Sequence, residues 1–317
     1  MTISVIIPVY NKQDYLRGCL DSIRFQTYSD IQVILVDDCS SDDSVSICEE
    51  YVKLDSRFQL EVHQQNKGQN GTIVDALAMA DGDWVAFVDS DDTLPLDALA
   101  NLAAFVDDQT DIIVGFAFEG DHSNSVMSIQ DWRSIMIGSD VVLCTRWAKL
   151  YRRTVLDDYT CSAPDGIKLG EDMIMNIKIA FKTDKQVKIT RQKVYEYFRN
   201  ETSYSVSHRW TVEKYARLYY ATRDCIPESE REKYAQALAN NGVGMIRRLV
   251  LRGSRAEQRK ISTSSFYCDV ASLIQSSGLA LTRMDALIMK RPSSLATRVF
   301  VQGYRGAQII FNRIFNH

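Results

Sequence analysis

This 317-residue sequence has few prolines, few histidines and no regular arrangement of cysteines. Its seven cysteines are widely spaced without a Cys-x-x-Cys pair, which excludes a disulfide framework and favours a reducing compartment. No stretch reaches the ~20 apolar residues of a membrane-spanning helix, and the apolar run at 2–8 is too short for a signal peptide. No Gly-rich phosphate loop follows that run, which argues against dehydrogenases and nucleotidyltransferases.

Charge is distributed unevenly along the chain. Residues 1–200 carry 19 Lys+Arg and 32 Asp+Glu, net −13, whereas residues 201–317 carry 18 and 9, net +9. Residues 241–317 alone hold 12 basic and 3 acidic side chains. This asymmetry indicates that the two parts meet different partners. With 45% hydrophobic residues, the chain is long enough to form two units, each with its own core.

Apolar runs alternate with amphipathic segments through the first ninety residues. Strands are expected at 4–10, 31–36, 58–63 and 84–88, with a helix after each of the first three. This alternation predicts an α/β protein with a doubly wound, mostly parallel sheet. Further strands are expected at 111–118 and 194–198, a helix at 170–181, and helices beyond about residue 210.

Acidic side chains follow several of these strands. The fourth strand ends in three carboxylates within four positions, Asp89, Asp91 and Asp92. Because the carboxyl ends of parallel strands meet at one sheet edge, Asp89 and Asp91 could converge on one Mg²⁺ or Mn²⁺. The alternative is a solvated acidic turn that caps the next helix.

Four ordered segments, 4–11, 36–44, 88–92 and 170–172, together resemble the motifs of glycosyltransferase family 2. The resemblance covers roughly residues 3–207. It implies the GT-A fold and an inverting, metal-dependent enzyme that moves a hexose-type sugar from a nucleotide donor, with UDP favoured, to a hydroxyl of a saccharide acceptor. Such enzymes take part in bacterial-type surface polysaccharide or lipid-linked oligosaccharide synthesis.

The resemblance also implies roles for individual residues. Asp172 matches the general base. Asp91 matches the ligand of a Mn²⁺ or Mg²⁺ ion, with Asp89 near the ribose or bound to the metal through water. His208 could be a third ligand or a surface residue. The residues expected to bind the nucleotide or donor are Pro8, Val9, Tyr10, Asn11, Asp37, Asp38, Asn66, Lys67, Gly68, Asp89, Ser90, Arg199 and Ser205.

Some of these assignments have structural alternatives. The pair Asp37 and Asp38 could form only a turn and a helix cap, and Glu171 with Asp172 could serve only to complement a helix dipole. Glu171 is expected to orient the acceptor, and Lys149 could contact it or brace the site. The chain departs from the family at 72–74, where many members carry Ala-Arg-Asn and this sequence has Thr-Ile-Val.

These observations divide the chain into a catalytic domain at 1–208 and a basic helical region at 209–317, which could serve membrane association, acceptor binding or dimerisation. Arg298, Gln302 and Arg305 alternate with apolar residues, as in a helix lying on an anionic membrane. A packed subdomain or a homo-oligomer interface is the alternative. We expect a cytoplasmic protein, peripheral at the inner face of the cell membrane, that binds no nucleic acid. A catalytically silent membrane-docking partner and a nucleotidyltransferase are the rival functions.

Overall fold

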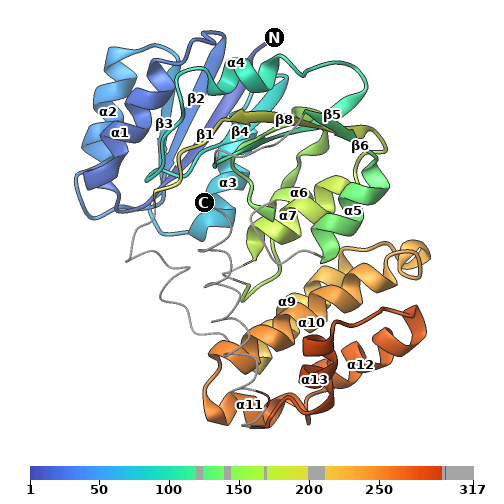
Figure 1. Cartoon of the computed structure of the whole chain (residues 1–317). Coiled ribbons are helices and arrows are strands. Elements are labelled where there is room, and N and C mark those ends of the chain that lie inside the picture. The colour runs from blue at the N-terminus through green and yellow to red at the C-terminus, as the bar shows by residue number, and fades with distance from the viewer. Residues whose placement is uncertain (119–123, 139–143, 168–169, 199–210, 295–296, 298–317) are drawn as a thin grey trace, which may run out of the picture. The chain divides into compact units, whose positions relative to one another are not determined.

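The computed structural model describes residues 1–118, 124–138, 144–167, 170–198, 211–294 and 297. Two compact units make up the chain (Figure 1). The first comprises Met1–Arg133 and Thr145–Ser203, and the second Ser134–Cys144 and Tyr204–His317.

The first unit is built on an eight-stranded sheet of order β3-β2-β1-β4-β7-β5-β8-β6 among the described residues. Its strands are β1 (Ile3–Val9), β2 (Ile31–Asp37), β3 (Phe58–Val62), β4 (Trp84–Phe87), β5 (Thr110–Phe116), β6 (Ser125–Met127), β7 (Lys149–Arg152) and β8 (Gln186–Lys193). The strands β1 to β4 pair in parallel, whereas β7 is antiparallel to both β4 and β5. The predicted doubly wound, mostly parallel sheet is therefore confirmed.

Helices connect the parallel strands. They are α1 (Gln13–Arg24), α2 (Ser44–Leu54), α3 (Gly68–Ala78) and α4 (Ala98–Ala103), followed by α5 (Ile129–Gly138), α6 (Asp158–Cys161) and α7 (Glu171–Ala180), with a 3-10 turn at Arg153–Val155. Alternate residues of a strand face opposite sides of a sheet. The side chains of Ile3, Val5, Ile7 and Val9 accordingly share one core with α1, α2 and α4.

The second unit is helical, as predicted. Its described elements are α9 (Val212–Asp224), a 3-10 turn at Glu228–Glu230, α10 (Ala235–Arg252), α11 (Arg255–Ile261), α12 (Ser265–Ser277) and α13 (Arg283–Lys290). The long helix α10 packs against each of the other four helices. Side-chain caps from Thr211, Ser254, Ser264 and Thr282 begin α9, α11, α12 and α13. Among the described residues, no helix combines the length and apolar character needed to cross a bilayer.

One strand prediction was wrong. The segment 194–198 is not a strand, because β8 ends at Lys193 and only an isolated bridge between Thr93 and Glu196 follows. The aromatic residues that suggested a strand lie in a loop instead. Within this loop Tyr195 is buried, and its ring stacks on Trp147 with the ring centroids 4.5 Å apart. The predicted amphipathic helix around Arg298 to Ile314 lies outside the described residues.

Candidate active site

The carboxyl ends of β1 and β2 are joined by their loops. Asn11, at φ 51°, donates its N–H to Ser40 Oγ (2.9 Å), and its side-chain oxygen accepts the N–H of Ser41 (2.8 Å). Asp42 accepts N–H groups near the starts of both following helices, from Gln13 (3.1 Å) and Ser44 (3.0 Å). The predicted segment Pro8 to Asn11 is therefore tied at Asn11 to the loop after β2, with the Tyr10 side chain exposed.

Asp37 and Asp38 have different surroundings although they are adjacent. Asp37 ends β2 and is fully buried. Its Oδ1 accepts the N–H of Ser40 (2.8 Å), while its Oδ2 has no hydrogen-bond partner among the described residues. Asp38 accepts the N–H groups of Lys67 (2.7 Å) and Gly68 (2.8 Å) and contacts His63. Asp38 therefore holds the 66–68 loop, and Asp37 retains a free acceptor.

The 66–68 loop and the start of α3 lie next to these acids. Asn66 donates its side-chain amide to the backbone oxygen of Asp38 (3.1 Å), and Gly68 adopts φ +75°, which favours glycine. Asn70 donates to Glu171 Oε1 (3.1 Å), so residues about one hundred positions apart in sequence meet here. The predicted residues Asn66, Lys67, Gly68 and Glu171 are therefore close to one another.

The four residues from Asp89 to Asp92, which follow β4 after Val88, differ in their surroundings. Asp91 forms an ion pair with Lys12, and Asp89 is largely buried. Asp92 is buried, where its carboxylate accepts Tyr195 Oη–H (2.8 Å) and the N–H of Phe198 (2.7 Å). Asp92 thus anchors the aromatic loop. Ser90 is buried between the acids.

Crowding changes the protonation of these acids. Burial raises the pKa of Asp89 to about 7, with Asp172, Asp92 and Asp91 adding to the effect and Arg146 opposing it. Burial likewise raises the pKa of Asp92 to about 6. Neighbouring carboxylates that disfavour one another's charge are relieved by a hard cation bound to oxygen. The side chains of Asp89 and Asp91 therefore fit the Mn²⁺ or Mg²⁺ ion expected from the sequence.

Asp172 lies in the first turn of α7, beside an arginine that the sequence did not single out. Gly170 adopts φ +95° before the helix and leaves Glu171 and Asp172 in its first turn. Both carboxylate oxygens of Asp172 are engaged by Arg146, one by the guanidinium (3.0 Å) and the other by the backbone N–H (3.2 Å). Arg146 is buried, and its Nε has no hydrogen-bond partner among the described residues. The only sequence signal was an arginine just before the aromatic and basic segment 147–151.

Lys149 contacts the backbone of the turn just before it. It is buried in β7, and its ammonium donates to the backbone oxygens of Thr145 (2.5 Å) and Trp147 (3.4 Å). This turn carries Arg146 and places Ala148 at φ +58°. Of the two roles expected for Lys149, these contacts favour bracing over acceptor contact.

The remaining predicted site residues, Arg199, Ser205 and His208, lie outside the described residues. At 72–74, Thr72 is buried and donates its hydroxyl to the oxygen of Gly68 (2.9 Å), and Ile73 belongs to the core. The structure therefore places no basic side chain where many family members carry arginine. Lys12, which the sequence did not single out, instead brings a positive charge to Asp91.

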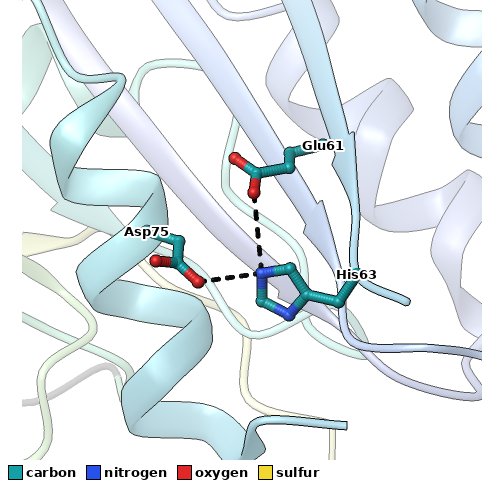
Figure 2. Close-up of side chains that lie close together, drawn as sticks. All are labelled: Glu61, His63 and Asp75. Carbon is teal, nitrogen blue, oxygen red and sulfur yellow. Dashed lines mark ion pairs between the residues drawn. The ribbon is translucent and has the colours of Figure 1, made fainter. Parts of the chain in front are cut away.

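A second cluster lies at the end of β3 and on α3. Glu61, His63 and Asp75 bring one ligand atom each to within 4.8 Å of one another (Figure 2). The cluster adjoins Asp38 through His63, whose Nδ1 is 2.9 Å from Asp38 Oδ1. Its two carboxylates are separate from Asp89 and Asp91.

The chain is similar in sequence to known proteins. A family model described as glycosyl transferase family 2 matches residues 4–160. EpsH of Bacillus subtilis is 33% identical over 175 residues, which cover 51% of this chain and 50% of EpsH. TarS of Staphylococcus aureus, a poly(ribitol-phosphate) beta-N-acetylglucosaminyltransferase by name, is 30% identical over 205 residues, 62% of this chain and 35% of TarS. The chain thus spans at most half the length of these relatives.

Solved structures show the same fold. The S. aureus TarS fragment 1–349 in complex with UDP-GlcNAc matches with TM-score 0.69 over 97% of this chain and 92% of that chain, at 22% identity. The Pyrobaculum calidifontis mannosyltransferase PcManGT, in complex with GDP-Man and Mn²⁺, matches with TM-score 0.56 over 99% and 87%, at 17% identity. At these identities the likeness concerns the fold, which is the GT-A fold.

Proposed function

Because the chain belongs to glycosyl transferase family 2, we propose that it transfers a hexose-type sugar from a nucleotide donor, UDP-linked, to a hydroxyl of a saccharide acceptor, with inversion at the anomeric carbon. The acceptor is a growing surface polysaccharide or a lipid-linked oligosaccharide. The observation that carries this proposal is the proximity of Asp89, Asp91 and Asp172, where Lys12 pairs with Asp91 and Arg146 with Asp172. Asp37 stands at the end of β2.

The nucleotide base is assigned to Asp37. The Oδ2 atom of Asp37 is buried without a hydrogen-bond partner among the described residues, and such an acceptor is costly unless a ligand supplies a donor. The imide N–H of uracil is a donor of the required kind. The TarS fragment was solved with UDP-GlcNAc, which favours UDP over GDP as the carrier in this chain as well.

The donor's diphosphate, which is the leaving group, is assigned to the part of the site that contains Asp89 and Asp91. A Mn²⁺ or Mg²⁺ ion, when bound by these carboxylates, supplies positive charge that neutralises the diphosphate as it leaves. Lys12 contacts Asp91. Because the Lys12 side chain is partly exposed, its ammonium can also contact the negative charge of the diphosphate. Lys12 is therefore a further donor-binding residue.

The role of general base, which takes the acceptor's hydroxyl proton, is assigned to Asp172. Inversion requires one displacement, so a base must take the acceptor's hydroxyl proton on the face opposite the diphosphate. Arg146 fixes the Asp172 carboxylate in one orientation in the first turn of α7. Glu171, held by Asn70, orients the acceptor.

Thermal-shift measurements with a panel of nucleotide sugars test the donor assignment. We expect UDP-sugars to raise the melting temperature more in Mn²⁺ than in chelator, because a ligand that binds only the native state stabilises it. Asp91→Asn should remove the Mn²⁺-dependent part of the shift, whereas Asp43→Asn, at the exposed start of α2, should not.

Transfer assays then separate the rival functions. Release of UDP with glycosylated acceptor supports the proposal. Donor binding without any turnover or donor hydrolysis would instead indicate a catalytically silent partner, and equal shifts with all nucleoside triphosphates would indicate a nucleotidyltransferase.

The location is proposed from the charge of the second part of the chain. Twelve basic against three acidic residues at 241–317 favour a peripheral association with an anionic membrane on the cytoplasmic side, where lipid-linked acceptors are found. A homo-oligomer contact remains the competing use of this region.

A further inference from the structure

His63 points its imidazole toward two carboxylates (Figure 2). Its Nε2 lies 3.0 Å from Asp75 Oδ2 and 3.8 Å from Glu61 Oε1. The His63 side chain is 2% exposed, whereas those of Asp75 and Glu61 are 30% and 43% exposed. A buried nitrogen thus faces two acids that are partly exposed to solvent.

The other ring nitrogen fixes the state of His63. Its Nδ1 is 2.9 Å from Asp38 Oδ1, and an ionised carboxylate can only accept a hydrogen bond. Nδ1 therefore carries the proton, and in a neutral ring Nε2 presents a lone pair. This Nε2 has no hydrogen-bond partner among the described residues, although it is buried. A lone pair facing two negative oxygens is repulsive unless a proton or a metal cation lies between them.

Lys67 supplies only part of the missing charge. Its ammonium is 2.6 Å from Asp75 Oδ2, so it neutralises one carboxylate. The Lys67 ammonium donates its hydrogen bond to Asp75, and His63 Nε2 has no hydrogen-bond partner among the described residues. The Lys67 side chain is 43% exposed and can move into solvent when another cation binds Asp75.

We propose that Glu61, His63 and Asp75 form a second metal site, specific for a divalent transition metal such as Zn²⁺. Imidazole nitrogen with carboxylate oxygens is a common Zn²⁺ ligand set. Bonds of about 2.1 Å at tetrahedral angles separate two ligand atoms by roughly 3.4 Å. The 3.0 Å and 3.8 Å distances from Nε2 lie on either side of that value. Water completes the fourth position.

Asp38 supports the site by its contact with Nδ1 of His63. A metal-bound histidine usually donates its other N–H to a carboxylate, which fixes the ring. Asp38 does this for His63 and also accepts the N–H groups of Lys67 and Gly68. The ion would therefore join β3 to α3 and hold the 66–68 loop in place. Its role is structural, and it is independent of the ion assigned to Asp89 and Asp91.

Metal binding to the full chain tests the proposal. The Asp91→Asn variant is used as the background, so that the first metal site does not contribute. After chelator treatment, equilibrium dialysis against Zn²⁺ should show about one ion per chain. Adding Glu61→Gln or Asp75→Asn should weaken Zn²⁺ binding tenfold or more, and adding Glu49→Gln, an exposed acid of α2, should leave it unchanged.

Spectroscopy identifies the nitrogen ligand. Co²⁺ in this background should give visible absorption bands that Glu61→Gln and Asp75→Asn diminish and that His63→Gln abolishes. Because His63 is buried, His63→Gln could fail to fold, and the two carboxylate variants then decide the matter.

Two results would overturn the proposal. One is Zn²⁺ binding that is absent in the Asp91→Asn background or equally tight in the Glu61→Gln and Asp75→Asn variants. The other is a nitrogen NMR spectrum in which both His63 nitrogens stay protonated at neutral pH with Zn²⁺ present. In that case a proton, and no metal, would balance the two carboxylates.

Discussion

Arg146 is the residue on which the candidate site depends most. Its buried guanidinium contacts Asp172 and acts electrostatically on Asp89, two acids from different elements. An arginine presents a planar, permanently charged group that can serve two acids with defined geometry. It thereby holds Asp172 in place and opposes the upward shift of the Asp89 pKa.

The first prediction concerns Asp172. Asp172→Asn keeps the size of the side chain but removes its ability to accept a proton. We expect sugar transfer to fall by ~10²–10⁴, the usual effect of losing a general base, with donor affinity near that of wild type. Steady-state kinetics together with donor titration measure both quantities.

Glu171→Gln is the matched control for Asp172→Asn. It changes the neighbouring acid in the same helix turn, keeps a side-chain oxygen for Asn70, and should alter acceptor KM more than turnover. A loss of donor affinity in Asp172→Asn without a loss of turnover would assign Asp172 to nucleotide binding.

The second prediction concerns acid stability. Burial pushes the pKa of Asp111 upward, but hydrogen bonds from Thr183 (2.7 Å), Lys185 (3.1 Å) and Arg152 (2.6 Å) outweigh it and hold the pKa below its usual value. Asp111 therefore stabilises the fold above its unfolded-state pKa, and this contribution is lost as pH falls through the lower folded-state pKa.

Asp111→Asn should accordingly lower the free energy of unfolding at pH 7 by about 1–3 kcal/mol. The difference from wild type should shrink below about pH 4, the ordinary range for aspartate. Urea denaturation at several pH values measures it. Asp108→Asn, an exposed acid nearby, should have little effect, and a difference that keeps its full pH 7 value down to about pH 2 would contradict the assignment.

At the scale of elements, the packing of α10 on α12 depends on a glycine. A Cβ built on Gly242 would lie 2.4 Å from Val270 Cγ2 and 3.1 Å from Tyr219 Cε2, both buried. Only hydrogen at this position lets the two helices approach. Gly242 is therefore retained in a helix interior, where glycine is otherwise unfavourable.

The third prediction is a pair of Gly→Ala changes with opposite signs. Gly242→Ala should destabilise the protein by about 1–3 kcal/mol, because the core must shift to admit a methyl group. Gly18→Ala lies on an exposed face of α1 with nothing within 4 Å, and should stabilise by about 0.5–1 kcal/mol. Thermal denaturation compares them, and stabilisation by both changes would show that α10 and α12 are not closely packed.

At the scale of the whole molecule, charge is the main asymmetry. The net charge of −13 over residues 1–200 would repel an anionic surface, and the net +9 over residues 201–317 would be attracted to it. Binding to such a surface would therefore depend on salt and on the basic part of the chain.

The fourth prediction uses three arginines of the C-terminal region. Changing Arg298, Arg305 and Arg313 to Gln should weaken binding to vesicles of anionic lipid at low salt roughly a hundredfold, at ~1 kcal/mol per side chain. Transfer to a soluble acceptor should be unaffected. Vesicle sedimentation across a salt series measures the binding.

Changing Lys53, Lys182 and Lys193 to Gln removes the same charge from the first unit and is the control for the arginine variant. It should not weaken vesicle binding. If the wild-type chain ignores anionic vesicles and instead forms dimers that the arginine changes dissolve, the C-terminal region is an oligomerisation element.

The sequence by itself determined the fold class, the order of the first four strands and three helices, and the positions of the acidic groups at the strand ends. These follow from local patterns: β-branched runs form buried strands, and carboxylates directly after them must lie at the sheet's edge. The alternation of strand and helix through Ile3 to Phe87 was predicted for the same reason. Whether Asp37, Asp91 and Asp172 bind donor, metal and acceptor stays a prediction.

Only the tertiary structure decided which acids are available to a ligand. Asp38 and Asp92 look like Asp37 and Asp91 in sequence, yet their carboxylates are engaged by Gly68, Lys67, Tyr195 and Phe198. Those partners lie 29 to 106 positions away, beyond the reach of any local pattern. The roles of Lys12, Arg146 and His63 were hidden for the same reason, because the charge that a side chain meets is set by segments that approach it in space.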